Sequence, residues 1–255
     1  NEFLILQERF TSLGVPTVVA DPRDLEFDGR HLHAGGRRID LVYRRVLIND
    51  IVARPDDCRA LVEAYRANAV CVANTFRCKI PHKKAFFAVL TDERFAHLFT
   101  APERAVSAQS VPWTRVLADA ASTVAGRRVE LLDLVRRERE TFVIKPSDEF
   151  GGTGVTLGWE TAAGDWDAAI DRALASGITW IAQRRIDIRR EVFPIVETPF
   201  RVAMREMLVD FAPYLFRGKV SGFLTRLSAT GLANVTSGGG QVPSFVVSPR
   251  IGGHS

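Results

Sequence analysis

The stretch of sequence that decides the fold is FVIKPSDEFGGTGV, residues 142–155. An apolar run over residues 142–144 predicts a strand that ends at Lys145, and residues 151–154 then supply three glycines in four positions. Glycines let backbone N–H groups turn toward an anion, and a lysine ammonium places a compact positive charge on a phosphate oxygen. The stretch therefore predicts a phosphate-binding loop, and a plain hairpin loop with a surface lysine is the alternative.

Two common nucleotide-binding loops do not match this stretch. No Gly-Lys-Ser/Thr sequence opens a helix here, as a Walker A loop requires. A second strand, expected at residues 155–158, follows the glycines, whereas a helix follows them in a dinucleotide-binding fingerprint. A phosphate-binding loop at this position would therefore be of neither of these two types.

Composition and charge exclude several classes of protein. The 255 residues are 46% hydrophobic and 25% charged, as in an ordinary globular protein. No uncharged apolar run approaches the roughly 20 residues of a membrane-spanning helix, so no membrane partner is expected. The net charge is only +4, and the arginine pairs of the chain are scattered among acidic residues, as at residues 136–140. Nucleic acid is therefore not an expected partner.

The cysteines and the start of the chain indicate its setting. Three cysteines without metal-ligand spacing suit a reducing compartment, so we expect a cytoplasmic protein. The first residue is Asn1 and no targeting peptide is visible, so we expect the native start to lie upstream.

Residues 1–72 alternate between helical and strand patterns. Helices are expected at 2–13 and 61–67, the second capped by Asp56 and Asp57, and strands at 17–20, 39–43 and 69–72. This alternation favours a small α/β unit with a parallel sheet, in which Cys71 is buried. His31 and His33 flank an Asp-Gly hairpin turn with no third ligand nearby, so metal binding is not expected there.

The rest of the chain mixes helices with strands. Helices are expected at 83–98, 129–140 and 167–175, and strands at 142–145, 155–158 and 180–183. The last 60 residues are rich in strand patterns and glycine turns and contain no long helical pattern.

Five motifs occur in an informative order. A turn at residues 74–78 leads to Lys84, then come the strand-borne Lys145, the glycine loop at 151–154, a strand and the residues after it at 180–186, and a closing block at 222–226 and 234–241. In this series the chain resembles the circularly permuted ATP-grasp proteins related to glutathionylspermidine synthetase, over roughly residues 70–250. The resemblance implies an α+β fold, in which two α+β lobes clamp a nucleotide and a small α/β unit precedes them.

The resemblance also implies domains. Residues 1–72 would be a partial unit that precedes the ATP-grasp region, and residues 73–255 would be that region. Its first lobe, with Lys145 and the glycine loop, would cover about 115–186, and its second lobe about 187–255. The family's amino-terminal portion looks incomplete here, so part of the acceptor pocket would be missing.

The site residues follow from the same resemblance. Two lysines and the glycine loop would hold the phosphates of ATP, and the hinge between the lobes, at residues 180–186, would hold adenine through its backbone. Arg226 would stabilise the transferred phosphoryl group together with Lys145, and Asp210 and Asn234 would hold Mg²⁺. The implied nucleotide-binding residues are Lys84, Lys145, Gly151, Gly152, Thr153, Gly154, Gln183, Arg184 and Ile186.

Several of these roles have structural alternatives. Lys83 is the alternative to Lys84, and Lys145 is alternatively a solvent-facing strand end. Arg226 alternatively pairs with an acid across strands, and Asp210 and Asn234 alternatively occupy turns. Leu232 stands where the family commonly has an acid, which puts a second metal ion in question.

The implied activity is ATP-dependent ligation of a carboxylate to an amine or a thiol, through an acylphosphate and with release of ADP and phosphate. ATP and small-molecule or peptide carboxylates and amines would be the partners. A non-catalytic ATP-binding or scaffold module with the same fold is the alternative function.

Overall fold

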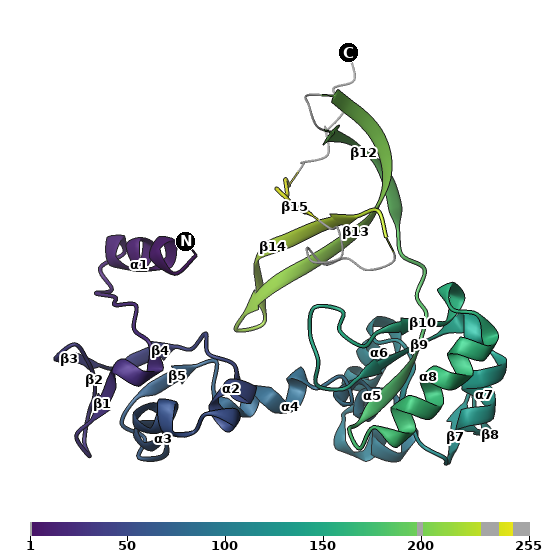
Figure 1. The fold of residues 1–255 in the computed structure, drawn as a ribbon, viewed down its shortest axis with the longest axis horizontal. Helices are drawn as coiled ribbons and strands as arrows, with labels where there is room; N and C mark the ends of the chain where they lie inside the picture. The colour runs from purple at the N-terminus through teal and green to yellow at the C-terminus, as the bar shows by residue number, and fades with distance from the viewer. Residues whose placement is uncertain (1, 198–200, 231–239, 247–255) are drawn as a thin grey trace. The chain divides into compact units, whose positions relative to one another are not determined.

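The computed structural model describes residues 2–197, 201–230 and 240–246 (Figure 1). The chain divides into two compact units, Asn1–His82 and Lys83–Ser255. This division falls ten residues beyond the boundary expected after residue 72. Among the described residues, every helix is too short or too polar to cross a lipid bilayer. The two units are described separately below.

The first unit contains two small sheets and short helices. Strands β1, β2 and β3 form an antiparallel sheet, and β4 and β5 pair in parallel, as the alternation of helix and strand predicted. Helices α2 and α3 lie between β4 and β5 in the chain, which is the crossover that a parallel pair requires. The elements are α1 (Glu2–Ser12), β1 (Leu25–Phe27), β2 (Leu32–Ala34), β3 (Arg37–Ile39), β4 (Leu41–Tyr43), α2 (Ile48–Ala53), α3 (Arg59–Arg66), β5 (Cys71–Ala73) and α4 (Lys79–His82).

The core of the first unit joins the antiparallel sheet to α3. Leu32 of β2 and Leu61 of α3 are completely or almost completely buried, and Ala64, Val70 and Val72 complete the cluster. Because Leu32 points into this core, its neighbour His33 on β2 must point to the opposite face.

Three expectations for this unit were wrong. Residues 17–20 form no strand, because none of the described strands pairs with them. Asp56 and Asp57 do not cap α3; they lie in a 3₁₀ turn, where Asp56 bonds to Arg59. Cys71 is exposed, because strand alternation turns Val72 and not Cys71 toward the core.

The second unit contains two four-stranded sheets and a separate hairpin. The first sheet has the strand order β10-β9-β11-β6, the second has the order β12-β13-β14-β15, and β7 pairs with β8. The elements are α5 (Phe86–Thr91), α6 (Ala101–Ser110), β6 (Thr114–Val116), β7 (Ala121–Val124), β8 (Arg127–Glu130), α7 (Leu131–Arg137), β9 (Phe142–Pro146), β10 (Thr156–Leu157), α8 (Ala163–Ala175), β11 (Trp180–Arg184), β12 (Arg190–Glu197), β13 (Arg201–Phe216), β14 (Lys219–Ser228) and β15 (Gly240–Val242).

Helices α7 and α8 cover one face of the sheet that contains β9 (Figure 1). Phe142 and Ile144 alternate along β9 and point into this core, where they meet Trp166 and Ile170 of α8. The Trp166 indole is fully buried and donates a hydrogen bond to the backbone oxygen of Val135 in α7 (3.1 Å). The core therefore fixes which face of β9 is left for a ligand.

Two helices expected in this unit are shorter than predicted. Residues 127–130 form β8 and not the start of a helix, because they pair with β7 across a tight turn at Ala125 and Gly126. The helical pattern at 83–98 divides into α5 and a 3₁₀ segment that begins after Asp92, whose side chain accepts from the backbone N–H of Arg94.

Candidate functional site

Strand alternation brings Lys145 to the face of the sheet opposite α7 and α8. On β11, Ile181 lies directly opposite Lys145, and Gln183 is the next residue on the same face. The ammonium of Lys145 donates to Gln183 Oε1 (2.8 Å), and Gln183 Nε2 donates to Thr114 Oγ1 on β6 (2.9 Å). A chain of hydrogen bonds across three strands therefore fixes the position of the lysine.

Ser147 places Lys84 beside the end of the same strand. The backbone N–H of Lys84 donates to the Ser147 backbone oxygen (2.8 Å), and the N–H of Ala85 donates to Ser147 Oγ (3.1 Å). The ammonium of Lys84 donates to the backbone oxygen of Glu149 in the glycine-containing loop. Ser147 is 2% exposed. Sequence reasoning missed Ser147 and Thr114, and the only signal for Ser147 is its place two residues after Lys145.

The two lysines affect each other electrostatically. Burial, and then the charge of Lys84, lower the pKa of Lys145 to about 8. Within the described part of the chain no carboxylate forms an ion pair with Lys145, whereas Lys83 lies 3.9 Å from Asp148. A partly buried ammonium without a counterion, next to a second ammonium, is suited to bind an anion.

The glycine loop has the backbone geometry that its sequence predicted. Gly151, Gly152 and Gly154 have φ angles of 66°, 83° and 71°, which side chains rarely allow. A Cβ at Gly154 would also lie 2.8 Å from Cγ of Pro146. The N–H of Thr153 donates to the Phe150 oxygen (3.2 Å). These bends keep the loop against the end of β9, beside the two lysines.

Some residues of the predicted adenine-binding segment bind other residues of the protein. The guanidinium of Arg184 pairs with Glu138 (2.8 Å) and lies over the Phe142 ring (4.2 Å to its centroid). Its backbone N–H donates to Trp113. Ile186 follows β11, is 57% exposed, and makes no backbone hydrogen bond to other described residues. Of the three residues expected here, Gln183 and Arg184 therefore have structural partners and Ile186 is open to a ligand.

Asp210 and Arg226 lie opposite each other on β13 and β14. Asp210 Oδ2 accepts from Arg226 Nε (2.7 Å) and contacts Nη2 (2.5 Å). Asp210 is therefore a strand residue and not a turn residue, and Arg226 makes the cross-strand pair that was the alternative to its catalytic role. Asn234, the other expected metal ligand, lies outside the described residues, as does Leu232.

Asp210 fits a magnesium ion that is held by few protein ligands. Asp210 keeps its second carboxylate oxygen clear of Arg226, and Mg²⁺ commonly takes one or two carboxylates together with phosphate oxygens and water. The lysines and the glycine loop likewise fit a triphosphate.

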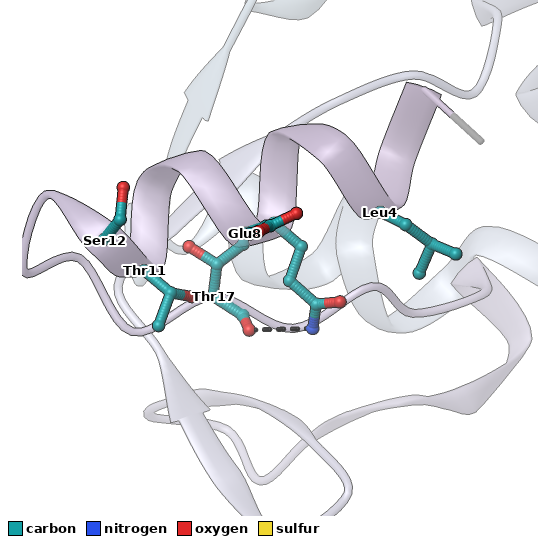
Figure 2. A pocket seen from close by; sticks show the side chains of 6 residues that line it. Leu4, Glu8, Thr11, Ser12 and Thr17 are labelled. Atoms are coloured by element: carbon teal, nitrogen blue, oxygen red, sulfur yellow. Dashed lines mark hydrogen bonds between the residues drawn. The ribbon is translucent and has the colours of Figure 1, made fainter.

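A hollow of about 580 Å³ lies in the first unit and has a different character (Figure 2). It lies along α1, where Gln7 donates a hydrogen bond to the Thr17 backbone oxygen (3.0 Å). Its charged lining residue is Glu8, so it offers nothing to an anionic ligand. The hollow is lined by Leu4, Gln7, Glu8, Thr11, Ser12 and Thr17.

Two curated relatives match most of this chain. A putative glutamate–cysteine ligase 2-3 of Frankia alni is 26% identical over 230 residues, which cover 86% of this chain and 24% of that protein. An uncharacterized protein of Mycobacterium bovis is 25% identical over 232 residues, which cover 85% of this chain and 38% of that protein. The chain thus spans well under half the length of these relatives.

Two solved structures are similar to the whole chain at low sequence identity. The D-cycloserine synthetase DcsG has a TM-score of 0.45 and 17% identity, over 94% of this chain and 69% of that one. The ATP-grasp ligase PsnB, complexed with minimal precursor, has a TM-score of 0.43 and 13% identity, over 94% of this chain and 85% of that one.

The family assignment rests on a sequence model. The model of a circularly permuted ATP-grasp matches residues 10–183, well over half of the chain. This range contains both lysines and the glycine loop, and it ends at Gln183. The α+β architecture described above agrees with the fold that the order of motifs implied. The chain belongs to the circularly permuted ATP-grasp family.

Proposed function

We propose that this chain is the nucleotide-binding part of an ATP-dependent ligase that joins a carboxylate to an amine or a thiol. The observation that carries the proposal is the pair of ammonium groups at Lys84 and Lys145 beside the glycine loop, where no carboxylate of the described residues pairs with Lys145. Family membership supports ligase chemistry, as does the name of the Frankia relative. The acceptor pocket would draw on the longer protein.

The residues of the β9 sheet would mainly position ATP. Lys84 and Lys145 would neutralise oxygens of the α- and β-phosphates, and backbone amides of residues 151–154 would cover the β- and γ-phosphates. Ile186 would meet adenine through its backbone. ATP supplies the phosphoryl group that converts a carboxylate into an acylphosphate, with release of ADP. The glycine loop would exclude water and so protect that reactive group.

The residues of the β12–β15 sheet would bind the metal ion and stabilise the negative charge of the phosphates. Asp210 and Asn234 would hold Mg²⁺ against the phosphate oxygens. Arg226 would stabilise the charge on the transferred group. Because Arg226 pairs with Asp210, a cation on Asp210 would weaken that pair and make the guanidinium available.

A non-catalytic ATP-binding or scaffold module is the second candidate. The pairing of Asp210 with Arg226, and Leu232 in place of an acid, favour it. In that case ATP would stabilise the protein, by roughly 2.7 kcal/mol at a hundredfold excess over Kd, and no ADP would form.

The test measures ADP release with Mg²⁺ and a panel of carboxylates and amines on the longest native protein, which would supply the acceptor pocket. We expect release that requires an acceptor and that Lys145→Ala abolishes. Lys219→Ala, at the exposed first residue of β14, is the matched control and should keep full activity. Full turnover by Lys145→Ala would overturn the ligase proposal, and a thermal shift by ATP without ADP would favour the second candidate.

A further inference from the structure

A second group of polar side chains lies on the β1–β2 hairpin, in the unit 1–82. Its turn closes with a hydrogen bond from the Asp28 N–H to the His31 oxygen (3.2 Å). Leu32, between the two histidines, is fully buried against Leu61. The core therefore anchors the hairpin and turns His31 and His33 together to its other face, where each is half-buried.

Asp28 is the third member of this group, although the sequence suggested no third ligand near the histidines. Its Oδ1 accepts from the backbone N–H groups of Arg30 (2.7 Å) and His31 (2.6 Å). These bonds hold the carboxylate in place and leave Oδ2 facing both imidazoles. Oδ2 lies 3.0 Å from His33 Nε2 and 3.9 Å from His31 Nδ1.

The chemistry of the three side chains suits a cation. A carboxylate oxygen and imidazole nitrogens are ligands that zinc and related divalent ions bind in proteins.

The distances suit a small divalent ion. One ligand atom from each of the three side chains lies within 4.8 Å of the others. Zinc binds imidazole nitrogen and carboxylate oxygen at about 2.0–2.2 Å, so two ligands of a tetrahedral ion are roughly 3.4 Å apart. The separations of 3.0 and 3.9 Å lie on either side of that value, so small side-chain rotations complete the site.

The charges directly opposite His33 in the sheet do not oppose such an ion. The residues opposite His33 in the sheet are Glu26 on β1 and Arg38 on β3. Arg38 pairs with Asp40 (2.7 Å), which offsets its charge. Glu26 adds a negative charge on the strand that faces His33.

We propose that Asp28, His31 and His33, the hairpin cluster, bind one divalent ion of the zinc class, with water in the fourth position. Two imidazoles and a carboxylate favour zinc, cobalt, nickel or copper over Mg²⁺, which prefers oxygen ligands. The bound ion would tie the turn to β2. This site is separate in chemistry from the proposed magnesium site, and it does not depend on the ligase proposal.

The test titrates Zn²⁺ into the metal-free 255-residue chain against a chromophoric chelator. Cys71→Ser/Cys78→Ser serves as the background, because thiolates of the less buried cysteines also bind zinc. We expect one ion per chain. His33→Ala should weaken binding by at least about a hundredfold, since even changes to groups behind the ligands cost about 10–100-fold. His97→Ala, outside the cluster, is the matched control and should bind like the parent.

Nitrogen NMR of the histidine rings provides a second measurement that does not depend on how the variants fold. One equivalent of Zn²⁺ should shift His31 Nδ1 and His33 Nε2, so that the two rings become fixed in opposite tautomers. A third expected result is a higher Tm with Zn²⁺ in the parent and not in His33→Ala. Unchanged ring nitrogens at one equivalent, or equal affinity in His33→Ala and the parent, would overturn the proposal.

Discussion

At the scale of single residues, Lys145 is defined by what surrounds its ammonium. Gln183 supplies a neutral acceptor, Lys84 supplies a like charge, and burial removes water. Each of these contributes to recognition of an anion, because a ligand phosphate would replace the missing counterion.

The lowered pKa of Lys145 predicts a pH dependence. Its pKa is about 8 in the folded chain, against an ordinary value of 10.5. Between these values the unfolded chain binds more protons, so the contribution of Lys145 to the free energy of unfolding becomes more favourable as pH rises from 8 to 10.5. Binding of ATP would reverse the shift, so the affinity for ATP should fall above about pH 8.

Calorimetry checks this prediction. At pH 8 the binding of ATP should take up roughly half a proton, measured from the dependence of the binding enthalpy on the buffer. Lys145→Arg is the control, since its guanidinium stays charged and removes the uptake. The same uptake in Lys145→Arg would assign the proton to another group.

Gln183 allows a test of positioning. Gln183→Leu removes the acceptor of Lys145 and the donor to Thr114 while keeping a similar volume. Because hydrogen bonds to charged groups are worth about 1.5–3 kcal/mol, we expect a rise in the Kd for ATP of at least about tenfold. Gln183→Glu should keep the acceptor and raise the pKa of Lys145. If Gln183→Leu bound ATP like the parent, the chain of hydrogen bonds would have no part in binding.

Sequence patterns revealed some of these residues and missed others for a physical reason. Lys145 was predictable because an apolar run and glycines mark it locally. Thr114 and Ser147 were not, because their roles depend on partners 69 and 62 residues away. Likewise, Cys71 sits in an apolar run, and only the orientation of β5 shows that it faces outward.

At the scale of elements, secondary structure depended on neighbours as much as on local preference. Residues 17–20 contain β-branched side chains and still form no strand, because no second strand pairs with them. Residues 142–146 form β9 because strands pair with both of its edges and helices cover one face. The loop after β9 is then constrained by contact with that strand.

Gly154 tests this constraint, with Gly151 as the matched control. Both have positive φ, and alanine there should cost about 1–2 kcal/mol in the free energy of unfolding. Only the Cβ at Gly154 would meet Pro146, whereas nothing lies within 4 Å at Gly151. Gly154→Ala should therefore cost about 1–3 kcal/mol more than Gly151→Ala. Denaturant unfolding measures both, and equal losses would contradict the contact.

At the scale of the whole molecule, each unit has a core of its own. Leu61 belongs to the core of the first unit and Ile170 to that of the second, and both are almost fully buried. The family assignment followed from motifs in order along the chain, which a sequence displays directly. The order of motifs did not reveal the division between His82 and Lys83, because that division depends on which contacts form in the folded chain.

The separate cores predict local effects of core mutations. Leu61→Ala and Ile170→Ala should each cost about 2–5 kcal/mol in their own unit. Hydrogen exchange should increase in β2 and α3 for the first variant and in β9 and α8 for the second. Equal increases throughout the chain in either variant would show that the two units unfold as one.

No carboxylate of the described residues neutralises Lys145, and this has a consequence for engineering the protein. A partly buried ammonium without a counterion lowers the stability of the fold, so a neutral replacement such as methionine should raise it. A selection for heat resistance alone would therefore enrich substitutions at this position and remove the positive charge that we propose binds the nucleotide. Under that proposal, thermostable variants are better sought with ATP present, so that the survivors keep their affinity for it.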